Sequence, residues 1–202
     1  LIYFMYMKQR VAAGIDEVGR GPLAGPIIAC AVIFSPKTKN SKIPSKLRDS
    51  KKLSAKQREK YYQLFLKHPN IQWGIGKITE KTIDRINIYQ ATKLAMERAV
   101  HNLSRKIVPG FLYIDGIMEI NVSIPQKTMV RGDETIQLCA MASIIAKVTR
   151  DRFMMNYHKK YPHYGFNLHK GYGTRLHIAM LKKYGPCSIH RKSFSPINSL
   201  VN

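Results

Sequence analysis

Two apolar runs near the start of the chain predict a pair of strands joined by a turn. Residues 11–15 and 27–34 are almost entirely apolar, as expected for buried strands. Pro22, Gly25 and Pro26 lie between the runs, and proline and glycine are the residue types that mark turns most strongly. The pattern therefore predicts a β-hairpin that carries its chemistry at the bend.

Farther along the chain, strand-like and helix-like patterns follow one another. Ser54, followed three residues later by Gln57, is typical of a capping box, so a helix is expected to begin there and to end at His68 and Pro69. Later segments show either strand-like alternation or apolar spacing close to 3.6 residues. Beyond the hairpin we expect strands over residues 71–78, 111–115 and 127–130, and helices over residues 54–68, 88–103 and 134–161.

The charge of the chain is strongly unbalanced. Lys and Arg number 34 against 12 Asp and Glu, and the formal net charge is +22. A compact chain tolerates such self-repulsion most readily when its partner is a polyanion, so nucleic acid is the first candidate and an anionic membrane surface the second. No apolar segment approaches the ~20 residues of a membrane span, and residues 1–7 are short and lack a basic n-region. We therefore expect no membrane association and interpret residues 1–7 as an edge strand or a ragged start.

Length and cysteine content bound the class of protein further. At 202 residues the chain is long enough for one domain with a substantial core. Cys30, Cys139 and Cys187 are odd in number and show no C-x-x-C spacing, so neither a disulfide framework nor a zinc knuckle is expected. These features favour a single-domain protein of a reducing cytoplasm.

Four acidic residues stand beside glycines or at strand ends, where a purely electrostatic nucleic-acid binder would gain by losing them: Asp16, Glu17, Asp115 and Asp133. Hard cations such as Mg²⁺ select oxygen ligands. Two such ions, about 4 Å apart, supply both an activated water and a stabilised leaving oxygen for phosphodiester hydrolysis. The four carboxylates therefore predict a metal-dependent active site.

Each of these carboxylates also has a purely structural interpretation. Asp16 and Glu17 can form an acidic turn, and they can share one ion only if the backbone leaves the extended conformation between them. Asp115 followed by glycine can begin a turn. Asp133 precedes the long helical pattern and can serve as its N-cap, a role that does not exclude metal binding.

Basic and aromatic residues supply candidate substrate contacts. Residues 35–52 are rich in Lys, Ser and Pro and are expected to form a basic surface loop, in which Lys51 and Lys52 are either phosphate contacts or a solvated charge pair. Tyr172, between two glycines, can lie flat on a sugar or base, or it can anchor its loop. Three histidines lack metal-ligand spacing and are interpreted as surface or phosphate-facing groups: His169, His177 and His190.

Several segments resemble one family in the order in which that family carries them. The string GIDEVGRG at residues 14–21, followed by PLAGP, resembles the opening signature of the type 2 ribonucleases H, the ribonuclease HII family. Members more often carry alanine where this chain has Val18, and the sister type III enzymes carry threonine where it has Arg20. The resemblance extends from about Val11 to Pro196 and includes DSKKLS at 49–54, SIIAKVTRD at 143–151, HKGYGT at 169–174 and HRKSFSPI at 190–197.

This resemblance implies a fold and an activity. The fold would be α/β, a ribonuclease H-like mixed sheet flanked by helices with a helical C-terminal part. Residues 1–202 would form one domain, with a catalytic core over about 10–160 and a substrate-holding part over about 161–202. The activity would be hydrolysis of the RNA strand of RNA/DNA hybrids and cleavage 5′ of single ribonucleotides in duplex DNA. Products would carry 3′-hydroxyl and 5′-phosphate ends, as in ribonucleotide excision during DNA replication and repair.

The resemblance also implies roles for individual residues. Two ions, Mg²⁺ or Mn²⁺, would be held by Asp16, which bridges them, and by Glu17, Asp115 and Asp133. The backbone of residues 19–21 would read the ribose 2′-hydroxyl, which distinguishes RNA from DNA. The substrate-binding set would be Gly19, Arg20, Gly21, Lys51, Lys52, Ser143, Lys147, Lys170 and Tyr172. A monomer is expected.

Two other functions fit part of the pattern. A non-catalytic nucleic-acid-binding protein, such as a ribosome-associated factor, would account for the charge alone. A metal nuclease of the same architecture that acts on DNA joints would account for the carboxylates. Tyr172 and the Gly19-Arg20-Gly21 segment argue against both.

Overall fold

A five-stranded mixed sheet forms the centre of the molecule. The computed structural model describes residues 11–35, Leu47 and residues 53–200. The strand order is β3-β2-β1-β4-β5, in which β1 pairs antiparallel with β2 and parallel with β4. The strands are β1 (Ala12–Val18), β2 (Ile27–Phe34), β3 (Ile71–Ile78), β4 (Phe111–Asp115) and β5 (Gln126–Met129).

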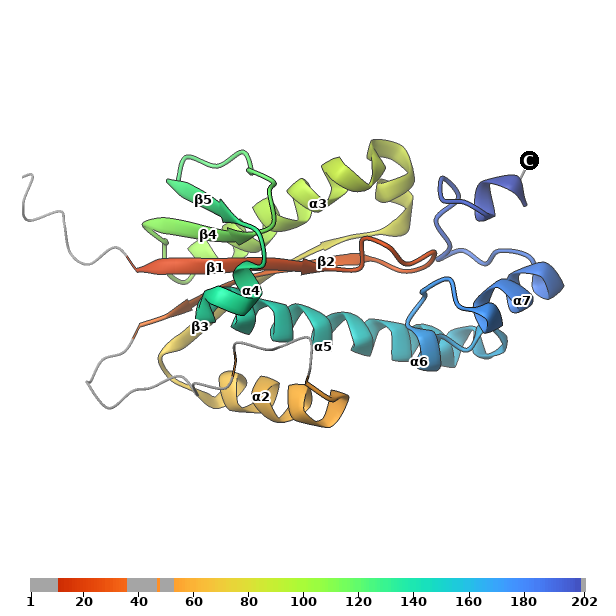
Figure 1. Ribbon diagram of the computed structural model, residues 1–202, viewed down its shortest axis with the longest axis horizontal. Helices are drawn as coiled ribbons and strands as arrows, with labels where there is room; N and C mark the ends of the chain where they lie inside the picture. Colours follow the sequence, from red (N-terminus) through yellow and green to blue (C-terminus); the bar gives the residue numbers. More distant parts are fainter. Residues whose placement is uncertain (1–10, 36–46, 48–52, 201–202) are drawn as a thin grey trace, which may run out of the picture.

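Helices cover both faces of this sheet, as Figure 1 shows, with α3 on one side and α5 and α2 on the other. The predicted α/β architecture of a mixed sheet flanked by helices is therefore confirmed. The helices are α2 (Ala55–Lys67), α3 (Glu80–Ser104), α4 (Gly132–Thr135), α5 (Gln137–Lys160), α6 (Phe166–His169) and α7 (Arg175–Tyr184), with short 3₁₀ helices at Pro162–Tyr164 and Ile197–Ser199. Within the described residues, none of these helices is both long and apolar enough to cross a membrane.

The predicted hairpin is present, and it is buried on both faces. In β2, residues from Ile27 to Ile33 are buried, which explains why the run is continuous rather than alternating. Gly14 in β1 permits α5 to pack directly on this strand, since a Cβ there would lie 2.3 Å from the backbone carbon of Leu138. This close contact places the side chains of α5 beside the end of β1.

The capping box at the start of α2 is confirmed. The Ser54 hydroxyl accepts a hydrogen bond from the Gln57 amide at 3.3 Å, and the Ser54 amide donates to Gln57 Oε1 at 2.8 Å. His68 is the C-cap, as the following proline predicts. The helix therefore begins and ends where the sequence indicates.

Two predicted helix boundaries were wrong, and each error has a local backbone cause. The helix expected from Ile88 begins at Glu80. The backbone at Asn87, with φ 63 and ψ 168, interrupts the helix, so the apolar spacing after Asn87 does not continue into the first turns. The helix expected over 134–161 is broken at Ile136, whose φ of −111 and ψ of 113 are extended. Asp133 consequently lies in the first turn of the short α4, whose N-cap is Arg131, and does not cap the long helix.

The C-terminal part packs against the bend of the hairpin. Its own apolar cluster includes Phe166 and Leu181, and it also takes in Leu23 and Ala24 from the hairpin bend. Backbone hydrogen bonds join the segments: Gly25 N donates to Ile189 O at 2.8 Å, and Leu23 N donates to Gly171 O at 2.8 Å. Figure 1 shows α6 and α7 beside this end of the hairpin. Segments from the two ends of the chain are thereby fixed to each other.

The three cysteines are free thiols, as predicted. Cys30 and Cys139 are buried and Cys187 is partly exposed.

Candidate active site

Three carboxylates meet at one edge of the sheet. Asp16 lies near the carboxyl end of β1 and Asp115 ends β4, and these strands run parallel with Ile15 opposite Ile114. Neighbouring parallel strands deliver their carboxyl ends to the same edge, so the two aspartates are adjacent. Asp133 joins them from α4, and one carboxylate oxygen from each of the three lies within 4.8 Å of the others.

Hydrogen bonds fix the orientation of this group. Asp16 Oδ1 accepts from the Glu17 amide at 2.7 Å, and Asp115 Oδ1 accepts from the Gly132 amide at 2.6 Å. The second bond links the end of β4 to the start of α4, which carries Asp133. Backbone amides therefore hold the carboxylates of Asp16 and Asp115, and Asp133 is placed beside them by α4.

The electrostatics of the group fit a cation. Burial raises the pKa of Asp16 well above its ordinary value, and the negative charges of Glu17 and Asp115 raise it further, while a hydrogen bond with Ser143 acts in the opposite direction. Asp16 is only 5% exposed and Asp133 only 1%. A bound divalent cation would remove this repulsion, and an all-oxygen set suits Mg²⁺ or Mn²⁺.

Glu17 occupies a different place from the one expected if it were to share an ion with Asp16. Both residues lie within β1, so the backbone does not leave the extended conformation between them, and Glu17 is not part of the close carboxylate group. Its Oε1 lies 3.6 Å from Nη1 of Arg20. Burial raises the pKa of Glu17, and the Arg20 guanidinium offsets part of that increase. Glu17 nevertheless faces the same pocket.

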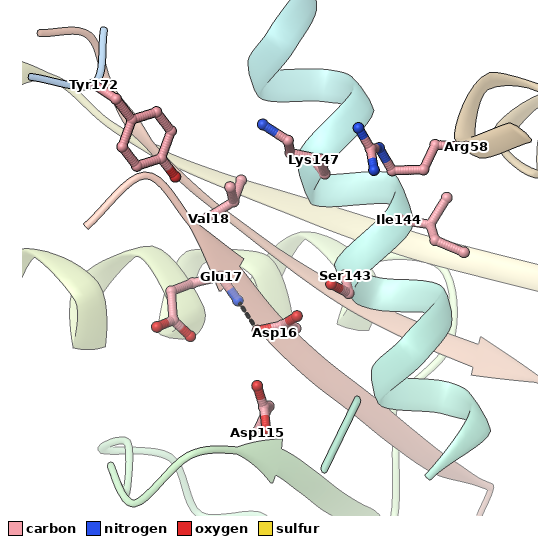
Figure 2. Close-up of a pocket in the computed structure, with 9 residues that line it drawn as sticks. All are labelled: Asp16, Glu17, Val18, Arg58, Asp115, Ser143, Ile144, Lys147 and Tyr172. Carbon is pink, nitrogen blue, oxygen red and sulfur yellow. Dashed lines mark hydrogen bonds between the residues drawn. The ribbon is translucent and has the colours of Figure 1, made fainter. Parts of the chain in front are cut away.

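A pocket of about 400 Å³ opens over these residues. Figure 2 shows the carboxylates of Asp16, Glu17 and Asp115 at one end, with Lys147 and Tyr172 at the other. Sequence analysis had identified six of the nine lining residues. The pocket is lined by Asp16, Glu17, Val18, Arg58, Asp115, Ser143, Ile144, Lys147 and Tyr172.

The backbone of residues 19–21 is held by a buried arginine. Arg191, which is 0% exposed, donates from Nη1 to Arg20 O at 2.8 Å and from Nη2 to Gly19 O at 2.5 Å. It also donates to Gly25 O through Nε at 3.1 Å and through Nη2 at 2.9 Å. The guanidinium thus ties both ends of the bend together.

A second buried arginine continues this bracing toward the Tyr172 loop. Arg150 donates to Pro26 O at 2.9 Å, to Ala24 O at 3.0 Å and to Lys170 O at 2.9 Å. Burial lowers the pKa of Arg150 to about 10 and that of Arg191 to about 9. Both values leave the side chains cationic near neutral pH, so their donors remain available to the loop carbonyls.

Tyr172 lies over the glycine-flanked bend. A Cβ built on Gly21 would be 4.0 Å from Tyr172 Cε1, and the Arg150 guanidinium is 5.9 Å from the ring centre. The side chain is 41% exposed and lines the pocket. The ring therefore lies at the pocket and is partly exposed.

The prediction for the three histidines was wrong. His169, His177 and His190 are 8%, 0% and 3% exposed, so they are not surface groups. His169 stacks on His177 with ring centres 4.4 Å apart, and Phe166 contacts both. Their spacing matches no known ligand motif, and only the fold reveals that three separate segments bring them together.

The remaining predicted substrate contacts have mixed positions. Ser143 and Lys147 line the pocket, and Lys147 Nζ lies 2.9 Å from Asp151 Oδ1. Lys170 does not line it, and its ammonium donates to Asn167 O. Lys51 and Lys52 lie outside the described residues.

Sequence reasoning missed three arginines. Arg58 lines the pocket from α2, and Arg150 and Arg191 brace the loops beside it. Arg150 and Arg191 stand within segments that resemble the ribonuclease HII family, but no chemistry had been assigned to them. Their partners are backbone carbonyls more than a hundred residues away or in a separate loop, which a local pattern does not show.

Comparisons with known proteins agree with this geometry. A family profile described as Ribonuclease HII matches residues 13–197. The chain is 48% identical over 191 residues to ribonuclease HII of Chlamydia caviae, covering 95% of this chain and 87% of that protein. It is 51% identical over 186 residues to ribonuclease HII of Acetivibrio thermocellus, covering 92% of this chain and 70% of that protein.

A solved structure supports the fold independently. The ribonuclease H2 of Pyrococcus horikoshii matches with a TM-score of 0.77 at 24% identity, covering 94% of this chain and 96% of that one. The profile spans nearly all of the described core and the C-terminal part. This chain therefore belongs to the ribonuclease HII family of endoribonucleases, which cleave the RNA of RNA/DNA hybrids.

Proposed function

We propose that this ribonuclease also cuts on the 5′ side of single ribonucleotides embedded in duplex DNA, and that it does so with two divalent cations. The observation that carries the proposal is the position of Tyr172 beside Gly21, in the same pocket as Asp16 and Asp115. A ring and an accessible backbone next to the carboxylates can read a sugar within reach of the reactive phosphate.

The metal ions would be held by Asp16, Asp115 and Asp133, with Glu17 facing the same space. Mg²⁺ or Mn²⁺ bound there would activate the attacking water and stabilise the leaving oxygen, so that products carry 5′-phosphate and 3′-hydroxyl ends. The protein contributes the fixed carboxylates, and the Ser143 hydroxyl supports Asp16 from α5. No side chain needs to form a covalent intermediate.

Recognition would come from the loops at the other end of the pocket. The carbonyls of Gly19 and Arg20 are occupied by Arg191, so this bend is preformed before substrate arrives. Backbone groups of Gly19-Arg20-Gly21 would then contact the 2′-hydroxyl, the group that DNA lacks. Tyr172 would pack on the following sugar and favour a step from RNA to DNA.

The positive side chains would bind the phosphate backbone. Lys147 and Arg58 face the pocket, and Lys51, Lys52 and Lys170 are proposed to extend this contact. We also propose that the enzyme acts as a monomer in the reducing cytoplasm. The free thiols of the three cysteines support the reducing compartment.

A cleavage assay tests the proposal directly. Duplex DNA with one ribonucleotide is incubated with Mg²⁺, Mn²⁺ or EDTA, and a long RNA/DNA hybrid serves as the second substrate. We expect one metal-dependent cut that leaves 3′-hydroxyl and 5′-phosphate ends. Cleavage of the hybrid alone would contradict the recognition of single ribonucleotides.

Variants of Tyr172 locate that recognition. Tyr172→Ala is expected to lose about five- to hundred-and-fifty-fold in cleavage of the single-ribonucleotide duplex, the scale of a lost stacking contact. Tyr172→Phe should retain more activity, because stacking requires the ring. The long hybrid should lose less, since most of its positions present no step from RNA to DNA. Equal losses on both substrates would indicate a loop anchor instead.

A further inference from the structure

A chain of buried imidazoles ends on the backbone of Tyr172. His190 Nε2 lies 3.0 Å from His177 Nε2, and His177 Nδ1 lies 2.9 Å from Tyr172 O. Both rings are almost fully buried, and neither faces the substrate pocket. Their polar atoms therefore act within the protein.

The backbone partners determine which nitrogen of each ring carries the proton. His190 Nδ1 lies 2.9 Å from the Cys187 amide nitrogen and 3.2 Å from the Cys187 carbonyl oxygen. The amide can only donate and its contact is the shorter one, so we assign Nδ1 as an acceptor and place the proton of His190 on Nε2. That Nε2–H donates to His177 Nε2, which leaves the proton of His177 on Nδ1. This Nδ1–H in turn donates to Tyr172 O.

The third histidine, His169, holds the backbone of Gly171, the residue before Tyr172, by hydrogen bonds of the same kind. His169 Nδ1 accepts from the Gly171 amide at 3.1 Å, and its Nε2 donates to Tyr164 O at 2.7 Å. Burial lowers the pKa of all three histidines, and for His177 and His190 it reaches about 4. Neutral rings are consistent with the protons that these contacts require.

We propose that His177 is a positioning residue for Tyr172, and that His190 sets its tautomer through the bond between the two Nε2 atoms. The chain of donors fixes the carbonyl of Tyr172 and hence the direction in which its ring leaves the loop. The consequence for catalysis rests on the proposed role of Tyr172 at the ribonucleotide. The tautomers themselves do not depend on any activity.

The first test is NMR of the wild-type protein. Long-range ¹H–¹⁵N correlation at pH 7.5 reports which ring nitrogen of each histidine is protonated. We expect the proton on Nδ1 of His177 and on Nε2 of His190 and His169. A His177 ring protonated on Nε2, or on both nitrogens, would overturn the proposed relay whatever the enzyme cleaves.

The second test separates the two nitrogens of His177. The amide of asparagine reaches the position of Nδ1 and can still donate to Tyr172 O, whereas the amide of glutamine reaches the position of Nε2. His177→Gln is expected to lower kcat/KM on the single-ribonucleotide duplex about fivefold to tenfold, the scale of one lost hydrogen bond, and His177→Asn about twofold or less. His163→Gln, at an exposed histidine of the same C-terminal part, is the control and should match the wild type.

A double variant shows whether the effect passes through Tyr172. If His177 acts by placing that ring, then His177→Gln should cost less than about twofold once Tyr172→Ala is already present. An undiminished loss in that background, or equal losses for His177→Gln and His177→Asn, would overturn the positioning role. Unchanged cleavage by Tyr172→Ala alone would instead refute the proposed function of the tyrosine, and the NMR result would still decide the tautomers.

Discussion

The two ends of the candidate active-site pocket are built on opposite physical principles. At the acidic end, Asp16, Asp115 and Asp133 lie on strand ends and a short helix, and burial and the neighbouring carboxylates oppose the charge of Asp16. At the recognition end, irregular loops carry Gly21 and Tyr172, and buried donors satisfy the loop carbonyls behind them. A bound divalent cation would neutralise the charge of the acidic end, whereas the loop carbonyls of the recognition end already accept hydrogen bonds from the protein.

The difference teaches where this fold tolerates strain. Rigid elements can hold like charges together, because strand pairing fixes the spacing of the side chains even where the charges repel each other. Loops have no ladder of hydrogen bonds of their own, so their shape depends on Arg150, Arg191 and the histidine chain. Substitutions at the two ends should therefore differ in whether they affect catalysis or folding.

The largest expected effect separates activity from stability at the acidic end. Asp16→Asn or Asp115→Asn should reduce metal-dependent cleavage by at least about a thousandfold while hybrid binding persists. Because the raised pKa of Asp16 means that its ionised form destabilises the fold, Asp16→Asn should also increase the free energy of unfolding in EDTA at neutral pH.

Cleavage kinetics and thermal unfolding measure both quantities. Glu119→Gln, at an exposed acid outside the pocket, is the matched control and should change neither. Near-normal turnover in Asp16→Asn would remove the metal site from the mechanism.

Two glycines of the recognition end should respond very differently to the same change. Gly19 has φ +99, and a Cβ there would lie 2.3 Å from Arg150 Nε, so Gly19→Ala should cost about 2–4 kcal/mol of folding free energy. Gly21 has no such conformation, and its nearest neighbour would be Tyr172 Cε1 at 4.0 Å, so Gly21→Ala should cost less than about 1 kcal/mol. Urea unfolding measures both, and similar costs would show that the bend is not held as described.

The two ends should also respond to pH with opposite sign. Burial holds the pKa of His177 and His190 at about 4, below the ordinary 6.5, so the unfolded chain binds more protons between these values. Stability from the histidines is therefore complete above pH 6.5 and is lost as the pH falls toward 4. The raised pKa of Asp16 contributes in the opposite direction, since stability from that group decreases as the pH rises.

The Asp16→Asn substitution removes the opposing contribution of Asp16 to the pH dependence of stability. Urea unfolding of this variant between pH 6.5 and 4 therefore measures the contribution of the histidines. We expect the free energy of unfolding to fall by about 1–3 kcal/mol between pH 6.5 and 4, with His177 and His190 together responsible for the loss. Ring NMR signals of His177 or His190 that titrate near pH 6.5 would contradict the explanation.

The smallest expected effect concerns a basic side chain that faces the pocket, Arg58. Arg58→Gln should weaken hybrid binding less than about tenfold and reduce the slope of log affinity against log salt by roughly one unit. Arg98→Gln is the control, because Arg98 is an exposed side chain of α3, on the opposite face of the sheet from α2, and donates to Lys77 O. Equal salt slopes for Arg58→Gln and the wild type would exclude a phosphate contact by Arg58.

Local patterns predicted the elements well where one interaction dominates. The hairpin followed from two apolar runs, and the start of α2 followed from Ser54 and Gln57. Two helix boundaries were wrong because of the local backbone at Asn87 and Ile136, and the burial of the histidines was missed because partners in other segments decide it. The histidines were assigned to the surface because their spacing in the sequence does not show that their rings pack on Phe166 and on one another.

The sequence by itself determined the chemistry of this protein: the carboxylates at the strand ends, the glycines of the bend and the excess of positive charge. Composition and local spacing suffice for these features, because they depend on residue type and on position within one element. Only the tertiary structure decided that Asp133 joins Asp16 from a separate short helix, and that Glu17 stays outside their group. It also decided which donors hold Tyr172, because those contacts join segments far apart in the chain and depend on how helices pack on the sheet.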